Sequence, residues 1–163
     1  MAALTAVNPT VSKGGHMETV KKLILNGQSW SAGQFLFIDA NGLLEVCAIA
    51  QTVALGGIKY YALTDQADPG AVGVYAEVGV ITRDTIFEIH ELNGTVADAN
   101  VGDAYNLDVT ANVCTIDVDK VSEPALMVTE IAQDYERIKN VAADTSARLR
   151  VRVLSTLIDA LGA

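Results

Sequence analysis

Hydrophobic and polar residues alternate along this chain in short runs, with turn-forming residues between them. Runs of this length and period are typical of half-buried β-strands. The clearest stretch is residues 32–46, in which two apolar segments flank Asn41-Gly42. An Asn-Gly pair between two such segments is a strong signal for a β-hairpin. We therefore expect a strand, a tight turn and a second strand here.

A weaker copy of this hairpin follows at residues 101–116. Three positions match at a constant offset of 69 residues, namely Gly33 with Gly102, Gln34 with Asp103 and Asp39 with Asp108. The alternating segment at residues 147–153 likewise resembles residues 85–90. Two copies at this spacing predict a pair of related β units of roughly 65 residues, over residues 30–92 and 99–153. A solenoid is excluded, because it needs more copies at shorter periods.

Further strands are expected where short apolar runs end at turn residues. These runs cover residues 20–25, 58–63, 74–81, 85–92, 125–131 and 147–153. Little of the chain has a helical period. Residues 133–141 are expected to form a polar loop with a turn of helix, and residues 154–161 a short helix or an extended tail. Residues 21–163 are therefore predicted to form one compact all-β domain, a β-barrel or a β-sandwich.

Residues 1–20 show no hydrophobic period and contain Gly14-Gly15. We expect them to form an extended N-terminal arm rather than a packed element. Lys13 and His16, with Lys21 and Lys22 just after the arm, make this end basic on an acidic chain. The arm is either a frayed terminus or a segment that becomes ordered on a partner surface. In the second case these four residues are candidates for contacts with that partner.

Length and composition limit the classes of function. The chain has 163 residues, of which 50% are hydrophobic and 19% are charged, so it can bury a sizeable core. Its apolar runs are far shorter than the roughly 20 residues of a transmembrane helix. The first ten residues lack the basic start of a signal peptide, so we expect synthesis in a cytoplasm. The net charge of −9 argues against binding to nucleic acid or to an anionic membrane.

The residue types that carry most catalysis are scarce. Cys47 and Cys114 lie in apolar runs, where a free cysteine behaves as a small buried hydrophobe, so we expect both to be reduced and structural. His90 lies between Glu88 and Glu91 in an alternating strand, and we expect it to be solvated. No serine or cysteine stands in the setting of an activated nucleophile. The chain is therefore not expected to be an enzyme.

The acidic residues do not predict a metal site. Asp103, Asp108, Asp117 and Asp119 are spaced along strands and turns. Asp117 and Asp119 would share one strand face and could hold calcium, but the spacing of a dedicated calcium loop is missing. No glycine-rich segment has the lysine of a phosphate-binding loop. We expect no metal and no other cofactor.

Arg148, Arg150 and Arg152 are the most informative charges. Alternation places all three on one face of the last strand, opposite the apolar residues between them. They either pair with acidic residues of a neighbouring strand, such as Glu88 or Glu91, or contact another subunit or a partner surface. Trp30, which precedes the first hairpin, is expected to anchor the core or an interface.

The order of features in the first half of the chain resembles that of a known family. The hairpin at residues 32–46 is followed by an apolar run, a strand at residues 57–63, and a loop with Asp68-Pro69-Gly70 that leads into Gly73-Val74-Tyr75-Ala76. In this layout the chain is similar to the small capsid decoration proteins of tailed bacteriophages, also called cement or head-stabilising proteins. The likeness extends over residues 20–153.

The resemblance implies a compact β fold, no catalytic residues and no cofactor. It also implies a homo-oligomer, with a trimer favoured, which binds the major capsid protein on the outer surface of the virion. The N-terminal arm would reach neighbouring capsomers. Two alternatives stay open: another phage structural component, such as a head fibre, tail tube or connector, and a non-catalytic ligand-binding β module.

Overall fold

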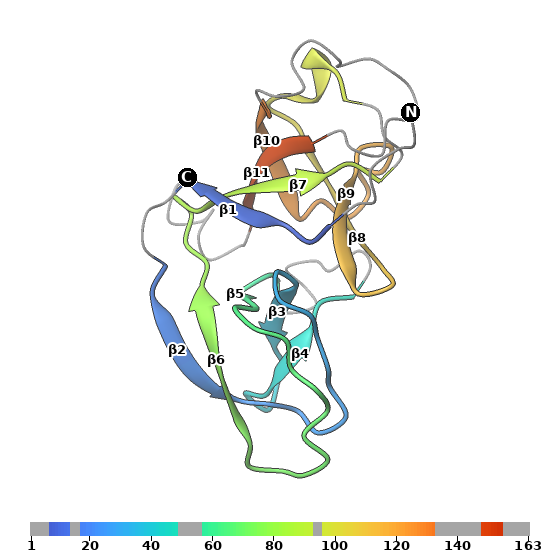
Figure 1. Ribbon diagram of the computed structural model, residues 1–163. Coiled ribbons are helices and arrows are strands. Elements are labelled where there is room, and N and C mark those ends of the chain that lie inside the picture. Colours follow the sequence, from blue (N-terminus) through green and yellow to red (C-terminus); the bar gives the residue numbers. More distant parts are fainter. Residues whose placement is uncertain (1–6, 14–16, 49–56, 93–95, 133–147, 155–163) are drawn as a thin grey trace.

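The computed structural model describes residues 7–13, 17–48, 57–92, 96–132 and 148–154 (Figure 1). These residues form two antiparallel sheets that pack together as a β-sandwich. The prediction of an all-β fold is confirmed, and of its two forms the sandwich is present rather than a closed barrel. No helix in the described part of the chain is long and apolar enough to span a membrane.

The larger sheet occupies the upper half of Figure 1. Its strand order is β1 (Thr10–Lys13), β7 (Ile86–His90), β11 (Arg148–Val153), β10 (Leu126–Ile131), β8 (Ala104–Thr110) and β9 (Val113–Asp117). A short 3₁₀ helix, η2 (Asp98–Asn100), precedes β8. An isolated bridge between Glu91 and Ile116 ties the chain after β7 to β9.

The smaller sheet lies below the larger one in Figure 1. Its strand order is β2 (Thr19–Leu23), β6 (Tyr75–Val80), β5 (Tyr60–Tyr61), β3 (Phe35–Ile38) and β4 (Leu44–Val46). An isolated bridge between Ile24 and Leu44 joins the two edges at one point, so the sheet curls around its own apolar residues. These residues form a separate small core of Ile24, Trp30, Leu36, Leu44, Ala62 and Val78.

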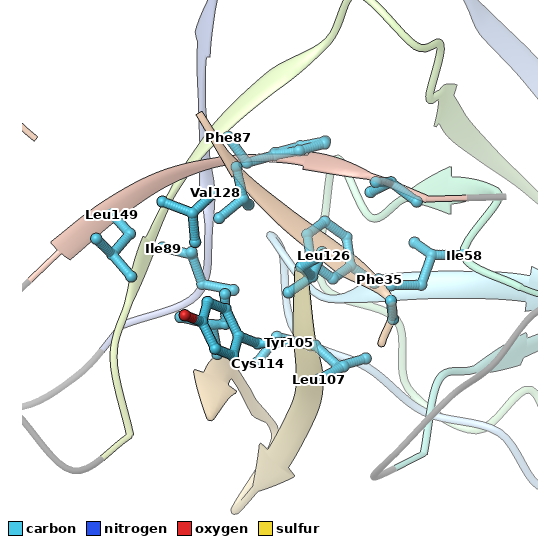
Figure 2. Packing of buried hydrophobic residues seen from close by; sticks show 14 of the residues in the cluster. Phe35, Ile58, Phe87, Ile89, Tyr105, Leu107, Cys114, Leu126, Val128 and Leu149 are labelled. Atoms are coloured by element: carbon cyan, nitrogen blue, oxygen red, sulfur yellow. The ribbon is translucent and has the colours of Figure 1, made fainter. Parts of the chain in front are cut away.

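The main core lies where the two sheets meet, and Figure 2 shows its packing. Phe35 of the smaller sheet meets Phe87 of the larger one edge to face, with ring centroids 5.0 Å apart. The ring of Tyr61 lies 5.3 Å from that of Phe87. Phe35 and Phe87 are both fully buried. Because aromatic pairs contribute both buried area and preferred geometry, this cluster holds the two sheets together.

Both predicted hairpins are present. In the β3–β4 hairpin, the amide of Gly42 donates to the carbonyl of Asp39, and the amide of Asp39 donates to the carbonyl of Leu43. The turn is thus a three-residue loop rather than a two-residue Asn-Gly turn, with Gly42 in the left-handed region at φ +79°. The Asp39 carboxylate closes the loop by accepting hydrogen bonds from the amides of Asn41 and Leu43.

The β8–β9 hairpin has the two-residue turn. Thr110 pairs with Val113, and both intervening residues, Ala111 and Asn112, have positive φ, which is the type I′ geometry. Gly33 and Gly102 precede their hairpins with nearly equal φ values of +90° and +93°. Their matched aspartates differ, because Asp39 lies in a loop whereas Asp108 lies inside β8. The internal repeat stays a prediction.

Residues 10–13, which were expected to belong to an unpacked arm, form β1 and pair with β7 at the edge of the larger sheet. Their pattern is short and mostly polar, so the pairing depends on β7 and not on local periodicity. Residues 19–23 form β2, as the end of the arm passes into the smaller sheet. The predicted turn of helix at residues 133–141 and the tail at residues 155–161 lie outside the described residues.

Candidate functional site

The arginine face of β11 is built by strict alternation. Leu149, Val151 and Val153 are fully buried in the main core, so Arg148, Arg150 and Arg152 lie on the opposite face. A guanidinium nitrogen of Arg148 lies 2.7 Å from a carboxylate oxygen of Glu88 on β7. Arg150 lies 3.7 Å from the other oxygen of Glu88 and 3.1 Å from Glu130 on β10.

The hypothesis of cross-strand pairing is therefore confirmed for Arg148 and Arg150. The carboxylate of Glu88 forms ion pairs with both arginines. The register explains this, because Glu88 lies directly opposite Arg150 and diagonally from Arg148 on the neighbouring strand. The side chains of Glu88 and Arg150 are only 17% and 18% exposed, so salt screens this network less than a surface pair. Arg152 is half-buried opposite Met127. A contact between these arginines and a partner stays a prediction.

The lysines of β2 lie on different faces. Lys21 is exposed and pairs in register with Glu77 of β6. The Lys22 ammonium group lies 5.9 Å above the ring of Tyr60, within the range of a cation–π interaction. Of these two residues, Lys21 is the more accessible to a partner.

Trp30 lies in the small core and is only 5% exposed. Its backbone exchanges two hydrogen bonds of 2.9 Å with Gln66. Of the two roles expected for Trp30, the structure therefore places it in the core. Lys13 pairs in register with Ile86 at the end of β1. His16 lies outside the described residues.

The segment before β1 is fastened to both sheets, which the sequence did not indicate. The side-chain amide nitrogen of Asn8 donates to the carbonyls of Ala32 and Asn112, and its oxygen accepts the amide of Cys114 at 2.9 Å. The hydroxyl of Tyr61 donates to the carbonyl of Pro9 at 2.7 Å. These partners lie 24 to 106 residues away along the chain, so no local pattern could have revealed them.

A shallow groove follows this segment between the sheets. Its volume is about 540 Å³, and it is lined mainly by apolar groups of Val7, Pro9, Ala32, Tyr61, Leu63 and Val113. Its size falls in the range of small-molecule sites. Burial raises the pKa of the Tyr61 phenol, which favours the neutral hydroxyl that donates to Pro9. The lining residues include no Asp, Glu, His, Lys, Arg or Cys, and Tyr61 is the residue among them with a titratable side chain.

The cysteines are buried, as expected. Cys47 and Cys114 are 1% and 0% exposed and belong to the main core. Burial raises the pKa of the Cys114 thiol to about 12, and it raises the pKa of Cys47 well above its ordinary value. Both thiols are therefore protonated at neutral pH and are poor nucleophiles.

The expectation that the His90 side chain is solvated is wrong, because it is only 6% exposed. It lies on the same face of β7 as Glu88, and its register partner on β11 is Arg148. Alternation placed it correctly on the outer face of the sheet, but that face is covered. Among the described residues, no three His, Cys, Asp or Glu side chains form a group that could hold a metal.

Comparison of the chain with models of known protein families and with curated proteins found no match. The likeness to phage decoration proteins therefore depends on the layout of the chain alone.

Proposed function

We propose that this protein is a structural component of a tailed-bacteriophage virion. It binds the major capsid protein on the outer surface of an assembled capsid and stabilises the shell through contacts between capsomers. It acts without catalysis and without a cofactor, as a homo-oligomer in which a trimer is favoured. It is made in the host cytoplasm and does not bind nucleic acid or membrane.

The observation that carries this proposal is that the segments of the resemblance form one structural unit. Residues 32–46 contribute β3 and β4, residues 57–63 contribute β5, and residues 65–79 contribute β6. All four strands are neighbours in the smaller sheet. The segments that carry the resemblance therefore belong to one folded unit, as a relationship to that family requires.

The loop before β6 offers a surface for the capsid contact. Val72 of this loop is 85% exposed, and Tyr75, the first residue of β6, is 61% exposed. The carboxylate of Asp68 accepts hydrogen bonds of 3.0 Å from the amides of Gly27 and Gly70, which brace the loop. A braced loop loses little conformational entropy when it binds, so exposed apolar side chains on it contribute more of their burial to affinity.

Co-sedimentation with expanded capsids that lack the protein tests this proposal. We expect the wild type to sediment with the capsids, and Val72→Asp to bind more weakly because it places a charge in an apolar contact. Val121→Asp is the matched control, since Val121 is a 64% exposed valine in a loop of the other sheet. No co-sedimentation of the wild type would contradict the proposal, whereas equal loss in both variants would contradict the assigned surface.

The groove supports a second candidate, a non-catalytic ligand-binding β module. Its apolar lining and its volume of about 540 Å³ suit a small apolar ligand. A fluorescent apolar dye that binds the wild type and is lost in Leu63→Asp, without any binding to capsids, would favour this candidate over the virion role.

A further inference from the structure

The β8–β9 hairpin has an unusual outer face. Leu107, Cys114 and Ile116 point into the main core, so alternation places Asn106, Asp108, Thr115 and Asp117 on the opposite face. A face that turns away from a core is normally solvated. Here all four residues are 8% exposed or less. The hairpin therefore buries a polar face as well as an apolar one.

Two of these buried side chains are carboxylates. Asp108 lies opposite Thr115, and Asp117 lies opposite Asn106. One pair, Leu107 with Ile116, separates these two pairs and faces the other way, so the two aspartates are diagonal neighbours on one face. Diagonal side chains of an antiparallel pair are roughly 7 Å apart, within reach of a shared ligand. Like charges this close and this well buried destabilise each other unless a counter-charge is present.

Among the ion pairs of the described residues, Asp117 has one weak positive partner on this face. The Lys120 ammonium lies 3.7 Å from one oxygen of Asp117, and the lysine side chain is 64% exposed. Exposed pairs of this kind contribute little to stability and separate easily. Asp108 accepts a hydrogen bond of 2.7 Å from the Thr110 hydroxyl, which carries no charge.

The hydroxyl of Thr115 is a second, independent observation on this face. Its oxygen is buried and has no hydrogen-bond partner, and the residue is 4% exposed. The register places this side chain directly opposite Asp108 and two residues from Asp117 on the same strand face. A buried hydroxyl without a partner costs free energy, so such groups call for a ligand or an ion.

We propose that this face of the β8–β9 hairpin is a calcium site, in which Asp108 and Asp117 supply carboxylate oxygens and Thr115 supplies its hydroxyl oxygen. Calcium accepts mixed oxygen ligands in flexible geometry, with water in the remaining positions, whereas magnesium demands a near-ideal octahedron. The ion displaces the Lys120 ammonium from Asp117. The ion links β8 to β9, which is the edge strand of the larger sheet.

This inference revises the sequence-based expectation about metals. The spacing of Asp117 and Asp119 predicts a pair that shares a strand face. In the structure Asp119 follows β9 in a turn, where its amide donates to the Asp117 carboxylate. The strand register instead brings Asp108 beside Asp117, and a register cannot be derived from spacing along one strand.

Calorimetric titration of the full chain with calcium chloride tests the site, with magnesium chloride as a comparison. We expect one calcium per chain with a Kd on the order of 10⁻⁴ M, weaker binding of magnesium, and a thermal unfolding temperature that rises with calcium and returns when a chelator is added. The proposal does not depend on the virion role, because the measurement uses the free chain. No heat of binding and no thermal shift at millimolar calcium would overturn it.

Three variants assign the ligands. Asp108→Asn should abolish binding, and Thr115→Val should weaken it about tenfold, the cost typical of losing a minor interaction at a metal site. Because Thr115→Val removes a hydroxyl that lacks a partner, it should fold at least as well as the wild type without calcium. Asp103→Asn, which changes an exposed aspartate before the same hairpin, should bind like the wild type. Unchanged affinity in both site variants would overturn the assignment.

Discussion

Replacement of Gly33 by alanine tests how the N-terminal segment fastens the two sheets. Gly33 has a φ of +90°, and a Cβ added there would lie 2.7 Å from the Cβ of Asn8 and 3.1 Å from the carbonyl oxygen of Pro9. Real Cβ atoms essentially never approach another atom below 3.0 Å. The segment must therefore move away from the smaller sheet in Gly33→Ala.

The cost has two parts. The first is the left-handed backbone, which costs alanine about 1 kcal/mol. The second is the displaced segment, which makes four hydrogen bonds through Asn8 and Pro9. If two of them break, at about 1 kcal/mol each, Gly33→Ala loses about 2 kcal/mol more than the backbone term alone.

Gly102→Ala is the matched control. Its φ is +93°, and no atom lies within 4 Å of the added Cβ, so it incurs only the backbone cost. Equilibrium unfolding in urea measures both free energies. In the Asn8→Gly background, which lacks the clashing Cβ, the cost of Gly33→Ala should fall towards that of the control, and the contact with the carbonyl oxygen of Pro9 accounts for the remainder. Equal losses in Gly33→Ala and Gly102→Ala would show that the N-terminal segment does not oppose a Cβ at position 33.

Two further predictions concern buried groups. Burial raises the pKa of the Cys47 and Cys114 thiols above 9.0, so below about pH 9 both folded and unfolded chains hold these protons. Above that pH only the unfolded chain loses them, and stability should fall by about 1 kcal/mol per thiol between about pH 9 and 10. Urea titrations should show a smaller fall in Cys114→Ala, and an equal fall would contradict the assignment. Glu88→Gln, which leaves Arg148 and Arg150 without their shared carboxylate, should cost about 1–2 kcal/mol. That loss should persist at about 1 M salt, because Glu88 and Arg150 are mostly buried. A loss that disappears at this salt concentration would contradict the burial of the network.

The elements that the sequence predicted are those set by local patterns. The hairpin around Asn41-Gly42 and the alternation of β11 depend on residues within a few positions of each other, and both are present. The pairing of the arginines with Glu88 was one of two open hypotheses, because alternation defines the face but not the neighbouring strand. The register between β7 and β11 decided it.

The features that the sequence did not predict depend on contacts between distant segments. β1 forms only because β7 offers an edge about 75 residues later in the chain. The burial of His90 and of the Asp108 face has the same origin. Strand patterns place these side chains on outer faces, and only the assembled fold shows that those faces are covered.

The proposal that this protein stabilises a phage capsid is tested by the heat resistance of the shell. Purified protein is added to expanded capsids that lack it, and calorimetry measures the temperature at which the capsids disrupt. We expect a rise in this temperature that saturates with added protein and is reduced for Val72→Asp but not for Val121→Asp. An unchanged transition temperature at saturating protein would contradict the proposed role on the capsid.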